Sequence, residues 1–136
     1  MQRSLEETRQ YFKNDRFAVH SGISIDEVGD GFARCSMKIE DHHKNARDVV
    51  MGGAIFTLAD FAFAALTNDR EKVTVAQQVS INYFAQPKGS RLIATARYKR
   101  DGRNSCVVNV DVVDDAGRDI AQFVGTGFKL AQEKAK

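Results

Sequence analysis

One apolar run constrains the fold of this chain more than any other feature. Residues 52–66 read GGAIFTLADFAFAAL, in which Thr57 and Asp60 are the polar side chains. The run is too long for a typical strand, and its Ala and Leu residues favour a helix. A helix that is apolar on nearly every side has to be covered by other elements. We therefore expect a long helix that the rest of the chain buries.

Segments on both sides of this run alternate with a period of two, which is typical of strands with one exposed face. Before the run, the capping box from Ser4 to Glu7 predicts a short helix over residues 4–14. The expected strands then extend from Phe17 to a glycine turn at 29–31 and over residues 33–40. Four more strands are expected after the run, over residues 73–85, 90–100, 104–114 and 118–130.

Turn signals that contain glycine separate these last four strands, at residues 87–89, 101–102 and 115–117. We interpret each as a tight hairpin, because glycine accepts the positive φ that such turns need. The four strands would then form a meander, and the apolar face of the last one would consist of Ile120, Val124, Phe128 and Leu130. The order of elements predicts an α+β fold in which one six-stranded antiparallel sheet wraps around the long central helix.

Length and charge limit the number of domains and the kinds of partner. A chain of 136 residues predicts a single domain over residues 1–136. Its 20 Lys and Arg residues nearly balance its 18 Asp and Glu residues, so neither nucleic acid nor an anionic membrane is expected as a partner. Charged residues interrupt the first twenty positions, which argues against a signal peptide, and we expect a cytoplasmic protein.

Cysteine and histidine do not predict a redox or metal site. Cys35 and Cys106 lie far apart between alternating apolar residues, and we expect reduced thiols in the core. Asp41, His42 and His43 are adjacent but lack a third ligand at a suitable spacing, so no metal is expected.

Asp60 is the most informative residue of the long helix. It places a carboxylate in an apolar segment, and residues 52–69 contain no Lys or Arg at helical spacing from it. Because burying an unpaired carboxylate is costly, such a group is expected to be partnered, protonated or functional. A purely structural alternative remains open, in which Asp60 reaches solvent or bonds a backbone N–H at a subunit contact.

Gly52 and Gly53 begin the same helix. The first backbone N–H groups of a helix have no internal partners and lie at the positive end of its dipole, so glycine there lets an anion or a polarised carbonyl oxygen approach closely. Eight residues separate Gly52 from Asp60, which corresponds to roughly 12 Å along a helix axis. One small reacting group cannot contact both, so joint action requires Asp60 from a second copy of the chain across a two-fold axis.

Residues 45–64, NARDVVMGGAIFTLADFAFA, resemble the signature N-x5-H-G-G followed by L-A-D of the hot-dog thioesterases of the phenylacetic-acid-degradation (PaaI-like) type. The resemblance extends over nearly the whole chain and includes residues 81–83, 92–96, 113–117 and 125–128. It implies a hot-dog fold, assembly as homodimers and commonly as dimers of dimers, and hydrolysis of acyl-coenzyme A thioesters. Coenzyme A would be part of the substrate, and no separate cofactor is implied.

The resemblance also implies roles for particular residues. Gly52 would donate its backbone N–H to the thioester oxygen, and Asp60 of the other subunit would activate water or attack the carbonyl. Asn45 would help to position the carbonyl or the water. We expect substrate contacts from the neighbouring Met51 and Gly53, from Phe56 on the helix, and from Arg100 and Arg103, whose charges could hold the phosphates of coenzyme A.

The chain departs from the signature at Met51, where the family usually has His. Methionine cannot make a comparable hydrogen bond, so the sequence allows either a thioesterase for medium-chain or aromatic acyl groups or a module that binds acyl-coenzyme A without catalysis. A hot-dog hydratase is less favoured, because no His is placed to pair with an Asp in the helix. The residue that aligns the water is not assigned, although Thr74, Ala76, Gln78 and Ser80 are expected to share one strand face.

Overall fold

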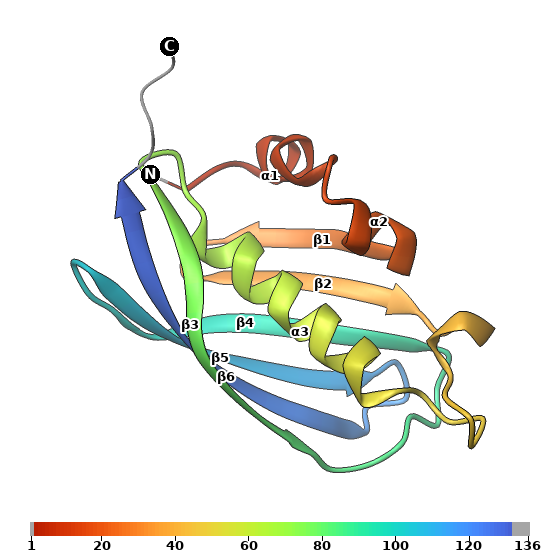
Figure 1. Cartoon of the computed structure of the whole chain (residues 1–136). Helices are drawn as coiled ribbons and strands as arrows, with labels where there is room; N and C mark the ends of the chain where they lie inside the picture. Colours follow the sequence, from red (N-terminus) through yellow and green to blue (C-terminus); the bar gives the residue numbers. More distant parts are fainter. Residues whose placement is uncertain (1, 132–136) are drawn as a thin grey trace.

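The computed structural model describes residues 2–131, which form three α-helices and one sheet (Figure 1). The helices are α1 (Leu5–Phe12), α2 (Arg16–Ser21) and α3 (Gly52–Thr67), and a short 3-10 helix, η1, covers Asp41–His43. The strands are β1 (Ile23–Gly29), β2 (Phe32–Lys38), β3 (Lys72–Tyr83), β4 (Arg91–Asp101), β5 (Ser105–Asp114) and β6 (Asp119–Ala131). Met1 and residues 132–136, which the expected domain includes, lie outside the described residues.

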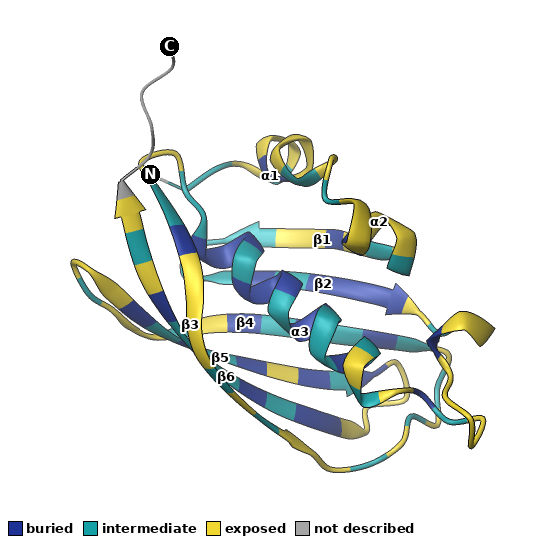
Figure 2. Cartoon of the chain, viewed as in Figure 1, coloured by how far each residue is buried: buried dark blue, intermediate teal, exposed yellow. Residues whose placement is uncertain are grey.

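The six strands form one antiparallel sheet in the order β1-β2-β4-β5-β6-β3. The sheet curves around α3, which lies across its concave side, while α1 and α2 lie at the β1 edge (Figure 1). Buried residues concentrate on α3 and on the central strands, and exposed residues concentrate on α1 and α2 (Figure 2). The expected architecture, a six-stranded sheet wrapped around a long helix, is confirmed.

The predicted meander is wrong at its first connection. β3 pairs with β6 at the far edge of the sheet, and β4 pairs with β2 and β5. Residues 84–90 therefore cross the end of the sheet, and they bond first to β6, through Phe84 N–H and Ile120 C=O at 2.8 Å, and then to the Asp114 carboxylate. The segment at 87–89 ends a crossover, because Pro and Gly signal a change of direction without specifying which strand comes next.

The strand expected from Phe17 begins later, because residues 16–21 form the helix α2. The Asp15 side chain caps this helix by accepting the Ala18 N–H at 3.1 Å, and Gly22 ends it in the left-handed conformation with φ of 80°. An Asp cap followed seven residues later by a left-handed glycine is a strong local signal for a short helix. Strand β1 then starts at Ile23.

Two further corrections concern the strands β3 and β6. A bulge between Ala76 and Gln78 reverses the alternation of β3, so Thr74 faces the core whereas Gln78 and Ser80 are exposed. The four residues expected to share a face therefore do not. On β6 the buried face consists of Ala121, Phe123, Gly125 and Gly127, whereas Phe128 and Leu130 are partly exposed.

The glycines of β6 explain why that face is buried. A Cβ at Gly127 would lie 2.5 Å from the Thr74 side chain and 3.0 Å from the Phe63 ring. Glycine at this position thus lets Phe63 of α3 pack directly on the strand backbone. Periodicity of large apolar residues could not reveal a buried face that includes two glycines.

Both cysteines are free thiols in the core, as expected, and burial raises the pKa of Cys35 and of Cys106. Within residues 2–131, no helix is both long and apolar enough to cross a membrane.

Candidate active site

The start of α3 is held by the loop that precedes it. The Met51 N–H donates to the His43 carbonyl at 2.8 Å, and the Gln86 side chain accepts the Val50 N–H at 3.0 Å. His43 is buried, with Nδ1 accepting the Glu40 N–H at 2.9 Å and Nε2 lying 2.7 Å from the Ser21 carbonyl. The ring therefore braces the loop and is not available as a ligand.

The first turn of α3 has free donors. Within the described chain, the N–H groups of Gly52 and Gly53 have no acceptor, as expected for the first turn of a helix. Their carbonyl oxygens accept side-chain donors, since Tyr83 Oη donates to Gly52 O at 3.0 Å and Thr57 Oγ1 donates to Gly53 O at 2.7 Å. These bonds fix the turn while its N–H groups remain available to an oxyanion.

Gly52 also allows the Tyr83 ring to pack against the helix start. A Cβ at this position would lie 3.2 Å from Tyr83 Cζ, so a larger residue would displace the ring. Met51, at the N-cap, makes no side-chain capping bond and is 55% exposed. Met51 therefore leaves the backbone N–H groups of the first turn as the donors that the helix start offers to a ligand.

Asn45 lies on the exposed loop before α3. Its Oδ1 accepts the Arg47 N–H at 2.9 Å, and its backbone bonds to Val49 and Asp48 close a tight turn in which Asp48 has a positive φ of 60°. The Asn45 oxygen thus stabilises the loop, and its Nδ2 has no partner among residues 2–131. This amide remains free to donate to a substrate or a water.

Asp60 lines a hollow of about 270 Å³ between α2 and α3. The other residues that line it are Asp15, Phe17, Ala18, Thr57, Phe61 and Ala64. The described residues provide no hydrogen bond or ion pair to the Asp60 carboxylate, which is partly buried. Burial raises the pKa of Asp60, and the negative charge of Asp15 raises it further. A carboxylate in this setting is suited to accept a proton.

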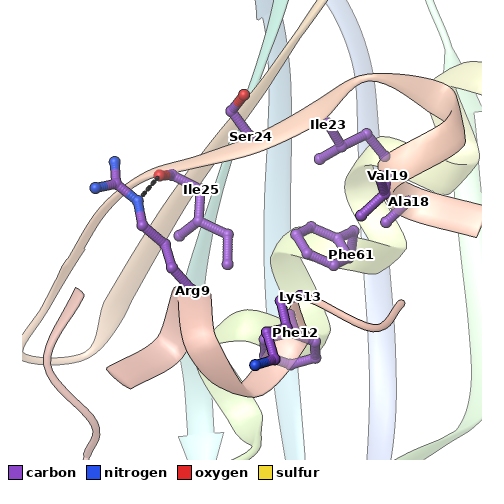
Figure 3. A pocket seen from close by; sticks show the side chains of 9 residues that line it. All are labelled: Arg9, Phe12, Lys13, Ala18, Val19, Ile23, Ser24, Ile25 and Phe61. Atoms are coloured by element: carbon purple, nitrogen blue, oxygen red, sulfur yellow. Dashed lines mark hydrogen bonds between the residues drawn. The ribbon is translucent and has the colours of Figure 1, made fainter. Parts of the chain in front are cut away.

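A second, larger hollow shares Ala18 and Phe61 with the first (Figure 3). It measures about 450 Å³ between α1, α2 and β1, and the edge-on pair of Phe12 and Phe61 rings forms part of its wall. Its cations are Arg9, whose Nε donates to the Ile25 carbonyl at 3.0 Å, and Lys13. None of the expected site residues lines this hollow, so we place the candidate site at Asp60 and the start of α3.

The remaining expected residues are not all near this site. Phe56 packs edge-on against Phe123 of β6, with ring centroids 5.5 Å apart, and does not line the Asp60 hollow. Arg100 and Arg103 flank the β4–β5 turn, which lies at the end of the sheet opposite to the start of α3 (Figure 1). Within one chain, the structure therefore brings Gly52, Gly53 and Met51 together and leaves both arginines apart.

Four residues of the site were missed by sequence reasoning. Tyr83 and Gln86 brace the helix start, and Asp15 and Phe17 line the Asp60 hollow. The cap signal at Asp15 could have revealed α2, but nothing in the sequence indicates that α2 packs beside Asp60.

Comparisons with known proteins agree on one family. Residues 48–121 match the family model described as the thioesterase superfamily. The chain is 31% identical to the acyl-coenzyme A thioesterase PaaI of Escherichia coli, over 88% of this chain and 86% of that protein. It is 31% identical to acyl-coenzyme A thioesterase 13 of Homo sapiens, over 74% of each. The solved structure of the E. coli PaaI protein from the phenylacetic acid degradation operon superposes with a TM-score of 0.85 at 27% identity, covering 93% of this chain and 96% of that one.

Proposed function

The chain belongs to the thioesterase superfamily of thioester hydrolases, and from this premise we propose that it hydrolyses a medium-chain or aromatic acyl-coenzyme A to the free acid and coenzyme A. The observation that carries the proposal is the Asp60 carboxylate, which lines a hollow without any partner in the described chain. A structural carboxylate in such a position would be expected to have hydrogen bonds. Coenzyme A enters as part of the substrate, so the reaction needs no separate cofactor.

The site we propose is shared by two subunits. Gly52 and Asp60 lie more than two turns apart on one helix, roughly 12 Å along its axis, so the two groups act together only across a dimer. The exposed edge strand β3 supports such a dimer, because it is twelve residues long and no strand of the described residues pairs with its outer side. Antiparallel pairing of two β3 strands about a two-fold axis would extend the sheet and bring the two α3 helices close together.

In this dimer each group has a distinct role. The Gly52 N–H of one subunit donates to the thioester oxygen as negative charge develops on it, and Gly53 allows close approach. Asp60 of the other subunit activates a water or attacks the carbonyl carbon, and Asn45 Nδ2 helps to position the carbonyl or the water. Met51 contacts the substrate but donates no hydrogen bond, so the backbone N–H groups stabilise the oxyanion.

The dimer also gives the distant arginines a place. Antiparallel pairing sets the start of β3 in one subunit beside the end of β3 in the other. Lys72, at the start of β3, donates to the Arg103 carbonyl at 3.1 Å, and Tyr83, at its end, contacts Gly52. The Arg100 and Arg103 hairpin of one subunit would then approach the Gly52 of the other, where it could bind the phosphates of coenzyme A.

An apolar patch supports a further association of dimers. Val75 and Phe128 are cross-strand neighbours on β3 and β6, and Leu130 lies two residues beyond Phe128 on the same face. These side chains are 42%, 39% and 43% exposed, respectively. Exposed apolar patches of this kind mark protein contacts.

A thiol-release assay over a panel of acyl-coenzyme A thioesters tests the reaction. We expect release from the wild type and its loss in Asp60→Ala. Tight binding of an acyl-coenzyme A by calorimetry, without thiol release from any thioester, would instead favour the non-catalytic module that Met51 suggests. Oxygen-18 that enters the enzyme from labelled water in a single turnover would identify Asp60 as a nucleophile, because such label requires an anhydride intermediate.

Mixed dimers test the shared site. Gly52→Pro removes the N–H at the first helical position. The helix backbone tolerates proline there, and Met51 already has the extended ψ of 137° that proline requires before it, although the proline ring would displace the Tyr83 ring that packs at this position. Gly52→Pro and Asp60→Ala dimers should each be inactive. Random mixing of the two should restore about a quarter of the wild-type activity, because half of the dimers regain one of two sites. No recovery, with heterodimers verified by mass spectrometry, would exclude catalysis across the interface.

A further inference from the structure

The short helix α2 lies beside the candidate catalytic carboxylate and forms one wall of its hollow. Its Phe17 and Ala18 face Thr57, Phe61 and Ala64 of α3 across the hollow that contains Asp60. Caps at both ends hold α2 in place, through the Asp15 side chain and the left-handed Gly22. The hollow is therefore bounded by ordered elements and has a defined composition.

The charge of the hollow limits what can occupy it. Its lining includes two carboxylates, Asp15 and Asp60, and no Lys, Arg or His. Coenzyme A carries several phosphate charges, which two nearby carboxylates would repel. In a thioester whose carbonyl carbon lies at Asp60, one substituent is the acyl group and the other leads to coenzyme A. The acyl group is therefore the part that can enter this hollow.

The rest of the lining is suited to an apolar group. Phe17 is 70% exposed, so most of its ring has no contact within the described chain. Phe61, Ala18 and Ala64 are the other apolar residues of the lining. Pockets that recognise small molecules combine such apolar walls with few polar groups, and here the polar group on the α2 side is an acid.

Building on the hydrolysis proposed above, we propose that the hollow between α2 and α3 is the acyl pocket, and that Asp15 in its lining restricts it to acyl groups without a terminal carboxylate. The subunit that supplies Asp60 then selects the acyl group, whereas its partner supplies the oxyanion donor. Asp15 acts as a specificity residue by repelling a second carboxylate from the substrate.

Two thioesters of equal chain length test the role of Asp15. Pentanoyl-coenzyme A and glutaryl-coenzyme A each have a five-carbon acyl group and differ in the terminal carboxylate. The wild type should prefer pentanoyl-coenzyme A in kcat/KM, and Asp15→Asn should reduce that preference roughly tenfold, mainly by improving glutaryl-coenzyme A. Asparagine keeps the cap of α2, because it is as good an N-cap as aspartate.

Asp30→Asn is the matched control, since it removes the same charge in the turn at the far end of β1 from α2. It should leave the preference at the wild-type value. Equal preferences in the Asp15→Asn and Asp30→Asn variants would overturn the role of Asp15. A wild type that hydrolyses both thioesters equally well would overturn this assignment but leave the proposed hydrolysis intact, whereas a wild type inert on every thioester would overturn both.

A second pair of variants tests whether α2 forms part of the acyl pocket. Phe17 and Val19 are both exposed apolar residues of α2, at 70% and 59%, but only Phe17 lines the Asp60 hollow. Phe17→Ala should lower kcat/KM for pentanoyl- and phenylacetyl-coenzyme A by about tenfold, through lost apolar contact. Val19→Ala should leave both values unchanged. Equal effects of the two substitutions would overturn the location of the acyl pocket.

Discussion

Two shielded aspartates of this molecule have opposite surroundings. Asp114, at the end of β5, is 2% exposed and accepts four backbone N–H groups, from Lys88, Gly89, Ala116 and Arg118, at 2.8–3.0 Å. These bonds, the Gly89 N–H first among them, lower the pKa of Asp114 to about 2. Asp60, in the middle of α3, has no hydrogen bond within residues 2–131, and burial raises its pKa.

The difference separates a structural acid from a candidate for the proposed reaction. Both carboxylate oxygens of Asp114 accept hydrogen bonds that join the crossover segment to the β5–β6 turn. They are therefore not available to a substrate. Asp60 contributes nothing comparable to the fold and keeps its lone pairs free beside a hollow. A carboxylate without hydrogen bonds is therefore the better candidate for catalysis. Substitution of Asp60 should lower activity but not stability, whereas substitution of Asp114 should lower stability but not activity.

The largest effect is expected from Asp60→Asn. Thiol release should fall by roughly 10²- to 10⁴-fold, because the amide can neither accept the proton nor attack the carbonyl. The melting temperature should stay the same or rise, because at neutral pH the ionised, partly buried carboxylate disfavours the folded state. Steady-state kinetics and thermal unfolding on the same preparation check both halves. A large drop in melting temperature would show that Asp60 is structural.

Asp114→Asn should show the reverse pattern. The amide nitrogen would face two N–H donors that the carboxylate oxygen now accepts, so both bonds would be lost. We expect a melting temperature lower by on the order of 5 °C, with activity per folded molecule close to that of the wild type. Calorimetry with an active-site titration measures the two quantities. Loss of activity without loss of stability would contradict the division of roles.

The pH dependence of the free energy of unfolding in acid should reveal the contribution of Asp114. Its folded-state pKa of about 2 lies below the ordinary value of 3.8, so its contribution to stability is full above about pH 4 and is lost as the pH falls toward 2. The free energy of unfolding of the wild type should therefore fall over this range. In Asp114→Asn the fall should be shallower, which denaturant titrations at several pH values can resolve. Parallel curves for both proteins would exclude Asp114 as the source.

The smallest effect concerns Asp15 and the pH dependence of the reaction. If ionised Asp60 is the reactive form, kcat/KM should fall with decreasing pH through a pKa that lies above the ordinary value for aspartate. Asp15→Asn removes a neighbouring negative charge, so this acidic limb should move to lower pH. Asp30→Asn should leave the limb in place. A shift of the same size in both variants would indicate a general effect of net charge.

Sequence reasoning captured the elements of this fold better than their connections. The apolar run at 52–66 predicted α3 to within one residue, because a long segment rich in Ala and Leu favours a buried helix. The crossover after β3 was missed, because Pro87 and Gly89 indicate a turn whether or not the next strand is the neighbour. The bulge in β3 and the glycines of β6 shifted which residues face the core, and neither follows from a period of two.

For the site, sequence reasoning identified the two ends of the proposed chemistry on α3 but not their surroundings. Asp60 and Gly52 stand out within one helix, so local composition was enough to select them. Asp15 and Asp60 are neighbours only because α2 folds back over α3, and Tyr83 reaches Gly52 only because β3 follows the helix along the sheet. Contacts between distant segments of this kind depend on packing that local patterns do not encode.

The pairing of β3 with β6 also bears on how the molecule is made. Lys72 is joined to Ala131 in the ladder, so β3 leaves the ribosome well before the strand that completes its hydrogen bonds. Until then the growing chain exposes both edges of β3 and the apolar surface of α3. Because closure over such a sequence separation is slow, the nascent protein should depend on chaperones until its last strand emerges, and premature termination before β6 should yield aggregates.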